Sequence, residues 1–232
     1  MTNQQVEILF LGTEFQLAGY HLKGEMMNFL KKWLGCILSF VAGVLGLDLS
    51  ACSGMVVGGN IDATALGAGV TDMGTEVTKG FEVITKGELY DSAKSMNLTS
   101  EFVALKVFAF ITLIASILLI AYSVVLLLKN LNVIKCDHKA FNIITIALNS
   151  FLLVATIGLL ITSCVYANAV EGVVTDMAKL SFTTSGLTAE QIAAIKFNIS
   201  ASVGLYQPLM LAFSAVSVIT IIIISYLKRK DA

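Results

Sequence analysis

Charge is scarce in this sequence of 232 residues. Only 13% of the residues are charged and 56% are hydrophobic, and the mean hydropathy is +0.85. Soluble globular domains carry about 25% charged residues, because their surface faces water. Proline is also nearly absent, since Pro208 is the only one, so long Pro-rich linkers are excluded. The net charge of −1 gives a nucleic-acid partner no electrostatic footprint.

Residues that carry out chemistry are few as well. The chain has two histidines, His21 and His138, and four cysteines with neither zinc-finger spacing nor the density of a disulfide scaffold. Phosphate-binding loops, G-x-S-x-G and H-E-x-x-H motifs do not occur. We therefore expect no enzyme activity, no bound metal and no cofactor.

What the sequence does contain is long runs without charge. Val107–Leu128, Ala140–Val170 and Phe197–Leu227 each lie between charged residues. A bilayer core about 30 Å thick needs roughly 20 apolar helical residues, so each run is long enough to cross it. A shorter run, Trp33–Leu47, is ambiguous between a span and the core of a signal peptide.

Positive charge is concentrated in three short segments, which predicts the orientation. These segments hold eight of the fifteen basic residues: Lys31, Lys32, Lys129, Lys135, Lys139, Lys228, Arg229 and Lys230. The long segments 53–101 and 168–207 have net charges of −4 and −1. Short basic segments stay in the cytoplasm. We expect a multi-pass protein of the cell membrane with both termini cytoplasmic and two extracytoplasmic loops.

The predicted fold class is an all-α integral membrane protein: a four-helix transmembrane bundle with a small helical extracytoplasmic cap. The predicted segments are a translated leader or disordered N-terminus (1–25), a first transmembrane helix or lipoprotein-like signal (26–51), an outer loop with an amphipathic helix (52–101), a transmembrane helix (102–128), a cytoplasmic loop (129–140), a transmembrane helix (141–167), an outer helical loop (168–207), a transmembrane helix (208–227) and a cytoplasmic tail (228–232).

The N-terminal region supports two interpretations. Lys23-Gly24-Glu25 can be encoded by a ribosome-binding sequence ahead of Met26 and Met27, which would make 1–25 the leader of a bacterial protein. From Met27, two lysines, an apolar core and Leu49-Ser50-Ala51-Cys52 resemble a bacterial lipoprotein signal. That resemblance implies lipidation of Cys52. The alternative is an uncleaved first span, which leaves Cys52 free to form a disulfide with Cys164 on the same side.

The first outer loop contains an apolar stripe at helical spacing. The spacing predicts a helix of about five turns that either packs on the outer domain, binds a partner or lies on the membrane. The stripe consists of Leu66, Val70, Met73, Val77, Phe81 and Ile84.

The second loop begins as a continuation of the third span. Helical spacing runs on to Leu180, and Ser185-Gly186 interrupts it. Thr188 and Gln191 form a capping-box pattern, which predicts a short helix that includes Ile192, Ile195 and Ile199. The sequons at Asn97 and Asn198 both lie in the outer loops.

Small and polar residues predict how the spans pack. Gly35, Ser39 and Gly43 recur every four residues, a spacing that lets helix backbones approach closely. Asn149 is the strongest polar side chain at mid-membrane depth, suited either to bonding a neighbouring helix or to lining a pore. No ionisable residue lies inside the spans, where such residues mark transport paths.

The layout resembles the tetraspan plan of claudins, tetraspanins and connexins in topology alone. The outer loops lack the cysteine motifs of those families, so the resemblance implies no functional residue. We expect a structural or assembly protein of the envelope that self-associates or binds another membrane protein within the lipid bilayer. The alternatives are a channel or transporter component with a polar path near Asn149, and a three-span lipoprotein anchored through Cys52.

Overall fold

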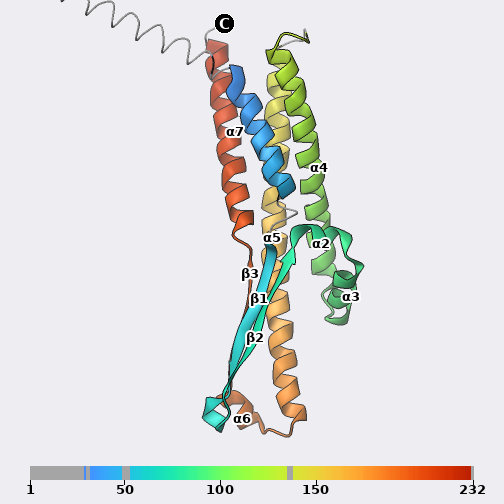
Figure 1. Ribbon diagram of the computed structural model, residues 1–232, viewed down its shortest axis with the longest axis vertical. Helices are drawn as coiled ribbons and strands as arrows, with labels where there is room; N and C mark the ends of the chain where they lie inside the picture. Colours follow the sequence, from blue (N-terminus) through green and yellow to red (C-terminus); the bar gives the residue numbers. More distant parts are fainter. Residues whose placement is uncertain (1–28, 30–31, 49–52, 135–137, 231–232) are drawn as a thin grey trace, which may run out of the picture.

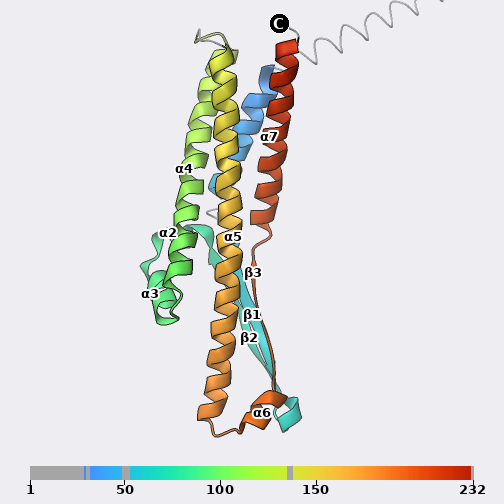
Figure 2. The ribbon, with the colours of Figure 1, turned by 180° about the vertical axis from the view of Figure 1, so that it is seen from behind.

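The molecule is elongated, with a bundle of helices at one end and a small mixed head at the other (Figures 1 and 2). The computed structural model describes residues 29, 32–48, 53–134 and 138–230. The C-terminal end of the last helix and the turn after Asn130 both lie at the end of the bundle opposite the head. The two long connecting segments, 53–98 and 185–205, therefore both lie at the other end of the molecule, where they form the head.

In the part of the chain that the structure describes, three helices are long and apolar enough to cross a membrane, as the charge-free runs predicted. They are α4 (Thr99–Asn130), α5 (His138–Thr184) and α7 (Tyr206–Lys230). A further helix over residues 32–48, blue in Figure 1, lies between α7 and α4. It is fastened to its neighbours by hydrogen bonds from Cys36 Sγ to the Ser123 carbonyl and from the Tyr206 hydroxyl to the Leu45 carbonyl.

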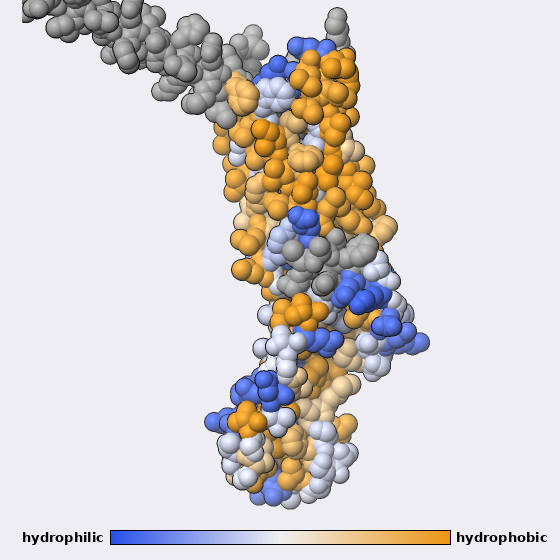
Figure 3. Space-filling model, viewed as in Figure 1, coloured by the Kyte–Doolittle hydropathy of each residue, from blue (hydrophilic) through white to orange (hydrophobic). Residues whose placement is uncertain are grey.

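The bundle carries its apolar side chains outside and many of its polar ones inside. Phe110, Val154 and Ile219 are 51%, 62% and 58% exposed, while Ser116 and Ser217 have no exposed surface. Figure 3 shows the resulting hydrophobic surface over the upper half of the molecule. Water would make such a surface unfavourable, whereas hydrocarbon suits it. The distribution matches a membrane protein.

Helix α5 extends well beyond the bundle and supports the head. Its 47 residues span about 70 Å at the rise of an α-helix, more than twice the thickness of a hydrocarbon core. The prediction that helical structure continues past the third span and ends near Ser185-Gly186 is confirmed, because α5 ends at Thr184 and Gly186 adopts a positive φ.

The head is a three-stranded antiparallel sheet with short helices around it. Its strands are β1 (Ser53–Asp62), β2 (Val70–Lys79) and β3 (Lys196–Val203), in the order β2-β1-β3. Its helices are the 3-10 turn η1 (Thr64–Leu66), α2 (Gly80–Thr85), α3 (Gly87–Ser95) and α6 (Ala189–Ala194). The capping box predicted at the start of α6 is present, with Thr188 and Gln191 bonded to each other's backbone N–H groups.

The prediction of an entirely helical cap is wrong, because the described part of the head contains this sheet. The predicted helix from Leu66 to Ile84 is instead η1, β2 and the beginning of α2. Gly67 and Gly74 have φ of 78° and 73°, a conformation that interrupts a helix. Strand β2, which contains Gly74, is rich in β-branched residues, which favour extended backbone.

The second short helix was also predicted too long. It ends at Ala194, and residues 196–203 form β3 instead. Ile199 is therefore a buried strand residue, paired with Gly59 of β1. The sheet overrides the helical spacing because β1 offers a complete hydrogen-bonding partner to this segment.

Candidate functional site

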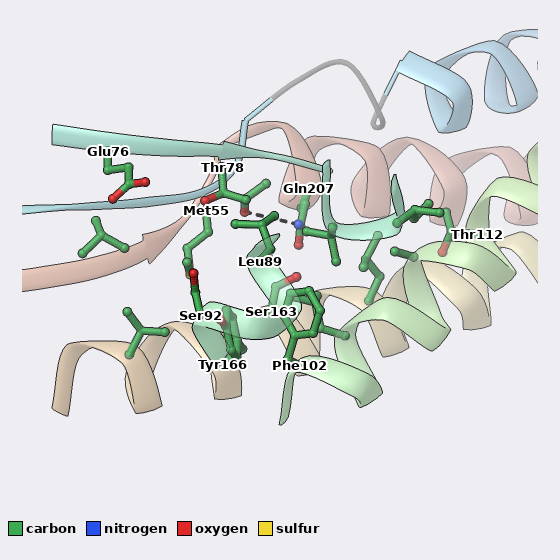
Figure 4. Close-up of a pocket in the computed structure, with 18 of the residues that line it drawn as sticks. Met55, Glu76, Thr78, Leu89, Ser92, Phe102, Thr112, Ser163, Tyr166 and Gln207 are labelled. Atoms are coloured by element: carbon green, nitrogen blue, oxygen red, sulfur yellow. Dashed lines mark hydrogen bonds between the residues drawn. The ribbon is translucent and has the colours of Figure 1, made fainter. Parts of the chain in front are cut away.

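A cavity of about 300 Å³ lies where the head meets the bundle. Strands β1 and β2, helices α2 to α5 and the beginning of α7 all contribute to its lining, together with Gly46 of the first helix (Figure 4). Such a volume is at the lower end of the range for small-molecule sites in proteins. This cavity is the candidate functional site.

The walls of the cavity are mostly apolar. Phe102 of α4 is 1% exposed, and its ring lies 5.6 Å from the ring of Tyr166 on α5, centroid to centroid. Other apolar side chains come from both head and bundle: Met55, Val57, Val83, Ile84, Leu89, Met96, Leu105, Leu113, Leu159, Val170 and Val174. The ionisable side chains among the described lining residues are Glu76 and Tyr166.

Two polar side chains in this apolar lining have an atom without a partner in the described structure. Ser163 is 2% exposed and its Oγ has no hydrogen bond. Gln207 is 6% exposed; its Nε2 donates to the Gly54 carbonyl at 3.3 Å, but its Oε1 accepts nothing. Figure 4 shows both side chains among the residues that surround the cavity. Buried polar atoms are almost always bonded, so this pair stands out.

On the bundle side of the cavity, buried polar groups continue into the interior of the bundle. Thr112 lines the cavity and donates to the Phe108 carbonyl, and Ser116, one turn on, donates to the Thr112 carbonyl. Deeper still, Asn149 Nδ2 donates to Ser39 Oγ at 2.9 Å and to the Thr145 carbonyl. Thr112 and Ser116 donate to carbonyl groups of their own helix. The bond between Ser39 and Asn149 joins two different helices.

The structure places the predicted packing residues unequally. Ser39 and Asn149 are buried and in contact. A Cβ on Gly43 would lie 2.6 Å from Ile120 Cγ1 and 3.1 Å from backbone atoms of Ile120 and Ser116, so α4 passes directly over this glycine. A Cβ on Gly35 would meet no atom of the described residues within 4 Å.

The residues of the predicted partner-binding stripe do not share one helix, because they lie in η1, β2 and α2. Val70, Met73 and Val77 lie on β2 and are 57%, 45% and 47% exposed, whereas Ile84 lines the cavity. Leu66 lies in η1, and Phe81 is in α2. The three exposed residues share one strand, not one helical face.

Cys52 lies outside the described residues, and so does the proposed leader 1–25. Cys164 on α5 is an exposed free thiol. The lipidation of Cys52 and its disulfide with Cys164 therefore remain predictions. Among the sequons, Asn198 is exposed on β3 and Asn97 adopts a φ of 59° just before α4.

Local hydrogen bonds shift the pKa values of three ionisable groups in the head and at the beginning of α4. The Thr64 hydroxyl and N–H both donate to Asp62, which lowers the pKa of that carboxyl. The Ser100 hydroxyl lowers the pKa of Glu101, and Glu82 raises the pKa of Lys86. None of the three groups is buried and each is bonded to a near neighbour in sequence, so these shifts mark turns and helix surface and not a reactive centre. Within the described residues no cluster of three metal-ligating side chains occurs.

Of the residues predicted as sites, Ile84 lines the cavity, whereas Ser163 and Gln207 were not predicted as site residues. Ser163 follows Thr162 in a span that looks like many others, and Gln207 is one amide before the single proline. Their only local signal was polarity at the outer ends of apolar runs. Comparisons with protein-family models, with curated proteins and with solved structures found no match.

Proposed function

We propose that this chain is a four-helix integral membrane protein of the cell envelope that acts by assembly, presenting its head to another membrane protein. In this proposal the helix at 32–48 is the fourth span, the termini are cytoplasmic and the head is extracytoplasmic. The hydrogen bonds that join this helix to α4, α5 and α7 support its place in the bundle. The basic segments at the end of the molecule opposite the head support the orientation.

The observation that carries the proposal is the open edge of β2. Within the described residues β2 pairs only with β1, and residues 70–77 are all exposed. The other edge is covered, because the N–H of Ala201 on β3 donates to Glu171 of α5 at 3.0 Å. An open edge strand is a template for a strand from another chain.

The partner best suited to this edge is an extended segment of a different protein. The sheet lies lengthwise along α5 (Figure 1), so the β2 strands of two copies in one membrane run in the same direction. An antiparallel pair of β2 strands, which needs opposite directions, is then excluded. Asp72 and Glu76 give the edge a negative charge, and we expect apolar and basic side chains on the partner segment.

Site-specific photo-crosslinking in native membranes tests this proposal. Val77 and Ser202 are matched positions, because both pair with Val56 and both are exposed, one on β2 and the other on β3. A benzoylphenylalanine at position 77 should crosslink a distinct membrane protein, and one at position 202 should not. Glu76→Lys should abolish the crosslink. Equal crosslinking at both positions, or crosslinks to further copies of this chain alone, would contradict the proposal.

The chemistry of the cavity supports a non-enzymatic role. Glu76 comes from β2 and Tyr166 from α5, and neither is hydrogen-bonded to a nucleophile in the described structure. A nucleophile within hydrogen-bond reach of a general base is one signature of a catalytic site. We propose binding and assembly, without catalysis.

A channel is the second candidate, and the buried polar groups of the bundle favour it. Asn149 Oδ1, Ser214 Oγ and Ser217 Oγ are buried without a hydrogen-bond partner among the described residues, as the lining of a narrow polar path would be. Ion flux through reconstituted liposomes that disappears in Asn149→Leu would establish this function in place of assembly. Flux equal to that of protein-free liposomes would exclude it.

A further inference from the structure

We propose that the cavity between head and bundle binds a single-chain, uncharged lipid that carries a hydroxyl headgroup, such as a monoacylglycerol. This inference does not depend on the assembly proposed above. It rests on three properties of the cavity, namely its unpartnered polar atoms, its apolar walls and the absence of cationic side chains from its described lining.

The first property is a donor and an acceptor left without partners. Most hydroxyls of Ser and Thr in the spans donate to a carbonyl three or four residues earlier, as Thr112, Thr156 and Thr162 do. Ser163 makes no such bond, although it is 2% exposed. The Nε2 group of Gln207 donates to the Gly54 carbonyl, which leaves Oε1 available as an acceptor. A ligand hydroxyl can accept from Ser163 and donate to Gln207, which satisfies both.

The second property is the shape and chemistry of the walls. The lining consists mainly of apolar side chains from α3, α4 and α5, among them Leu89, Leu105, Leu159 and Val170. A polar solute would leave its groups unpaired against these walls, whereas an acyl chain would not. The volume of about 300 Å³ suits one chain and not two.

The third property is the charge at the cavity. Among the described residues of the lining there is no lysine, arginine or histidine, and Glu76 is the one carboxylate. An anionic headgroup would be buried there without a counter-ion, at a high cost in free energy. A fatty acid anion or a phosphatidyl headgroup is therefore disfavoured, and an uncharged headgroup fits.

The position of the cavity gives such a lipid access. Ser163 lies within the apolar part of α5 and Thr112 within that of α4, both on membrane-length helices, while Met55 and Glu76 belong to the head. The cavity therefore lies at the level where the bundle leaves the bilayer. A lipid of one leaflet reaches this depth without crossing water.

Photoaffinity labelling of the full chain in phosphatidylcholine nanodiscs tests the proposal. The probe is a 1-monoacylglycerol with a twelve-carbon chain and a terminal diazirine, and labelled residues are identified by peptide mass spectrometry. We expect saturable labelling of residues that line the cavity, and competition by unlabelled 1-monolauroylglycerol. Laurate at pH 8 should compete at least tenfold less well.

Two variants and one matched control separate binding from folding. Ser163→Ala should raise the concentration for half-saturation about fivefold, the equivalent of one lost hydrogen bond. Ala109→Phe, which fills the cavity, should abolish saturable labelling. Ser217→Ala removes another buried, unpartnered hydroxyl that is not part of the cavity, and should leave labelling unchanged.

The proposal is overturned by any of three results. Labelling that does not saturate, or that spreads over the lipid-facing residues of α4 and α7, would mean that bulk lipid contact is being detected. Equal labelling of wild type, Ser163→Ala and Ala109→Phe would mean that the cavity is not the site. Equal competition by laurate would refute the uncharged headgroup.

Discussion

At the scale of single residues, Asn149 is the polar group whose role can be measured most directly. Its Nδ2 bonds Ser39 on a separate helix at 2.9 Å, in the buried part of the bundle. If packing is its role, Asn149→Leu should destabilise the protein by about 0.6–2 kcal/mol, the range for interhelical hydrogen bonds in membranes. Reversible unfolding in mixed micelles of wild type, Asn149→Leu, Ser39→Ala and the double variant gives the coupling energy. A coupling of zero would show that this bond does not stabilise the bundle.

Asp62 supplies a pH-dependent contribution to the stability of the head. Its carboxylate accepts from the Thr64 N–H at 3.0 Å and from the Thr64 hydroxyl, and its pKa is lowered. A lowered folded-state pKa stabilises the fold above the unfolded value near 3.9, and this stabilisation is lost as the pH falls through the folded pKa. Wild type should therefore melt above Asp62→Ala at pH 7, and the difference should vanish on acidification. A difference in Tm that is constant with pH would refute the role of the ionised carboxylate.

At the scale of elements, the sequence predicted the three membrane-length helices, but it predicted helical structure in the head where the structure has strands β2 and β3. The membrane-length helices follow from a strong physical constraint, because backbone polar groups in hydrocarbon must bond within their own segment. The strands depend on partners far away in the chain, since Gly59 of β1 lies beside Ile199 of β3. Valines at positions 70 and 77 suit one face of a helix and an exposed strand equally, so local spacing could not decide.

The cavity was unpredictable for the same reason. Its lining comes from head and bundle elements between Gly46 and Gln207, and no short motif unites them. By contrast, the capping box at Thr188 is encoded within four residues, and it was predicted correctly. Features formed by residues that are close together in the chain could be predicted from this sequence, and features formed by distant residues could not.

The close contact between the first helix and α4 gives a prediction with a control inside the same helix. Gly43→Ala would place a methyl group against Ile120 and the Ser116 carbonyl, and we expect a loss of about 1–3 kcal/mol. Gly35→Ala meets no atom of the described residues within 4 Å and should be neutral or slightly stabilising, because alanine is the better helix former. Thermal unfolding of both variants in one detergent tests this. Equal destabilisation by the two substitutions would mean that the helix does not pack as described.

At the scale of the whole molecule, orientation determines which compartment the head and the cavity face. The head carries both acidic connecting segments, and the opposite end carries most of the basic residues near helix ends. Since basic segments are retained in the cytoplasm, the head should lie outside the cell membrane. Every proposal about partners of β2 depends on this orientation.

Single-cysteine accessibility in intact cells tests the orientation with two exposed positions at opposite ends. In a variant with the four native cysteines replaced by alanine, Ser202→Cys reports on the head and Asn132→Cys on the turn after α4. A membrane-impermeant maleimide should label position 202 in intact cells, and position 132 only after permeabilisation. The reverse pattern would place the head in the cytoplasm, because neither residue can change sides without moving the whole bundle. The open edge of β2 would then face cytoplasmic partners, and the excess of basic residues at the other end would need a different explanation.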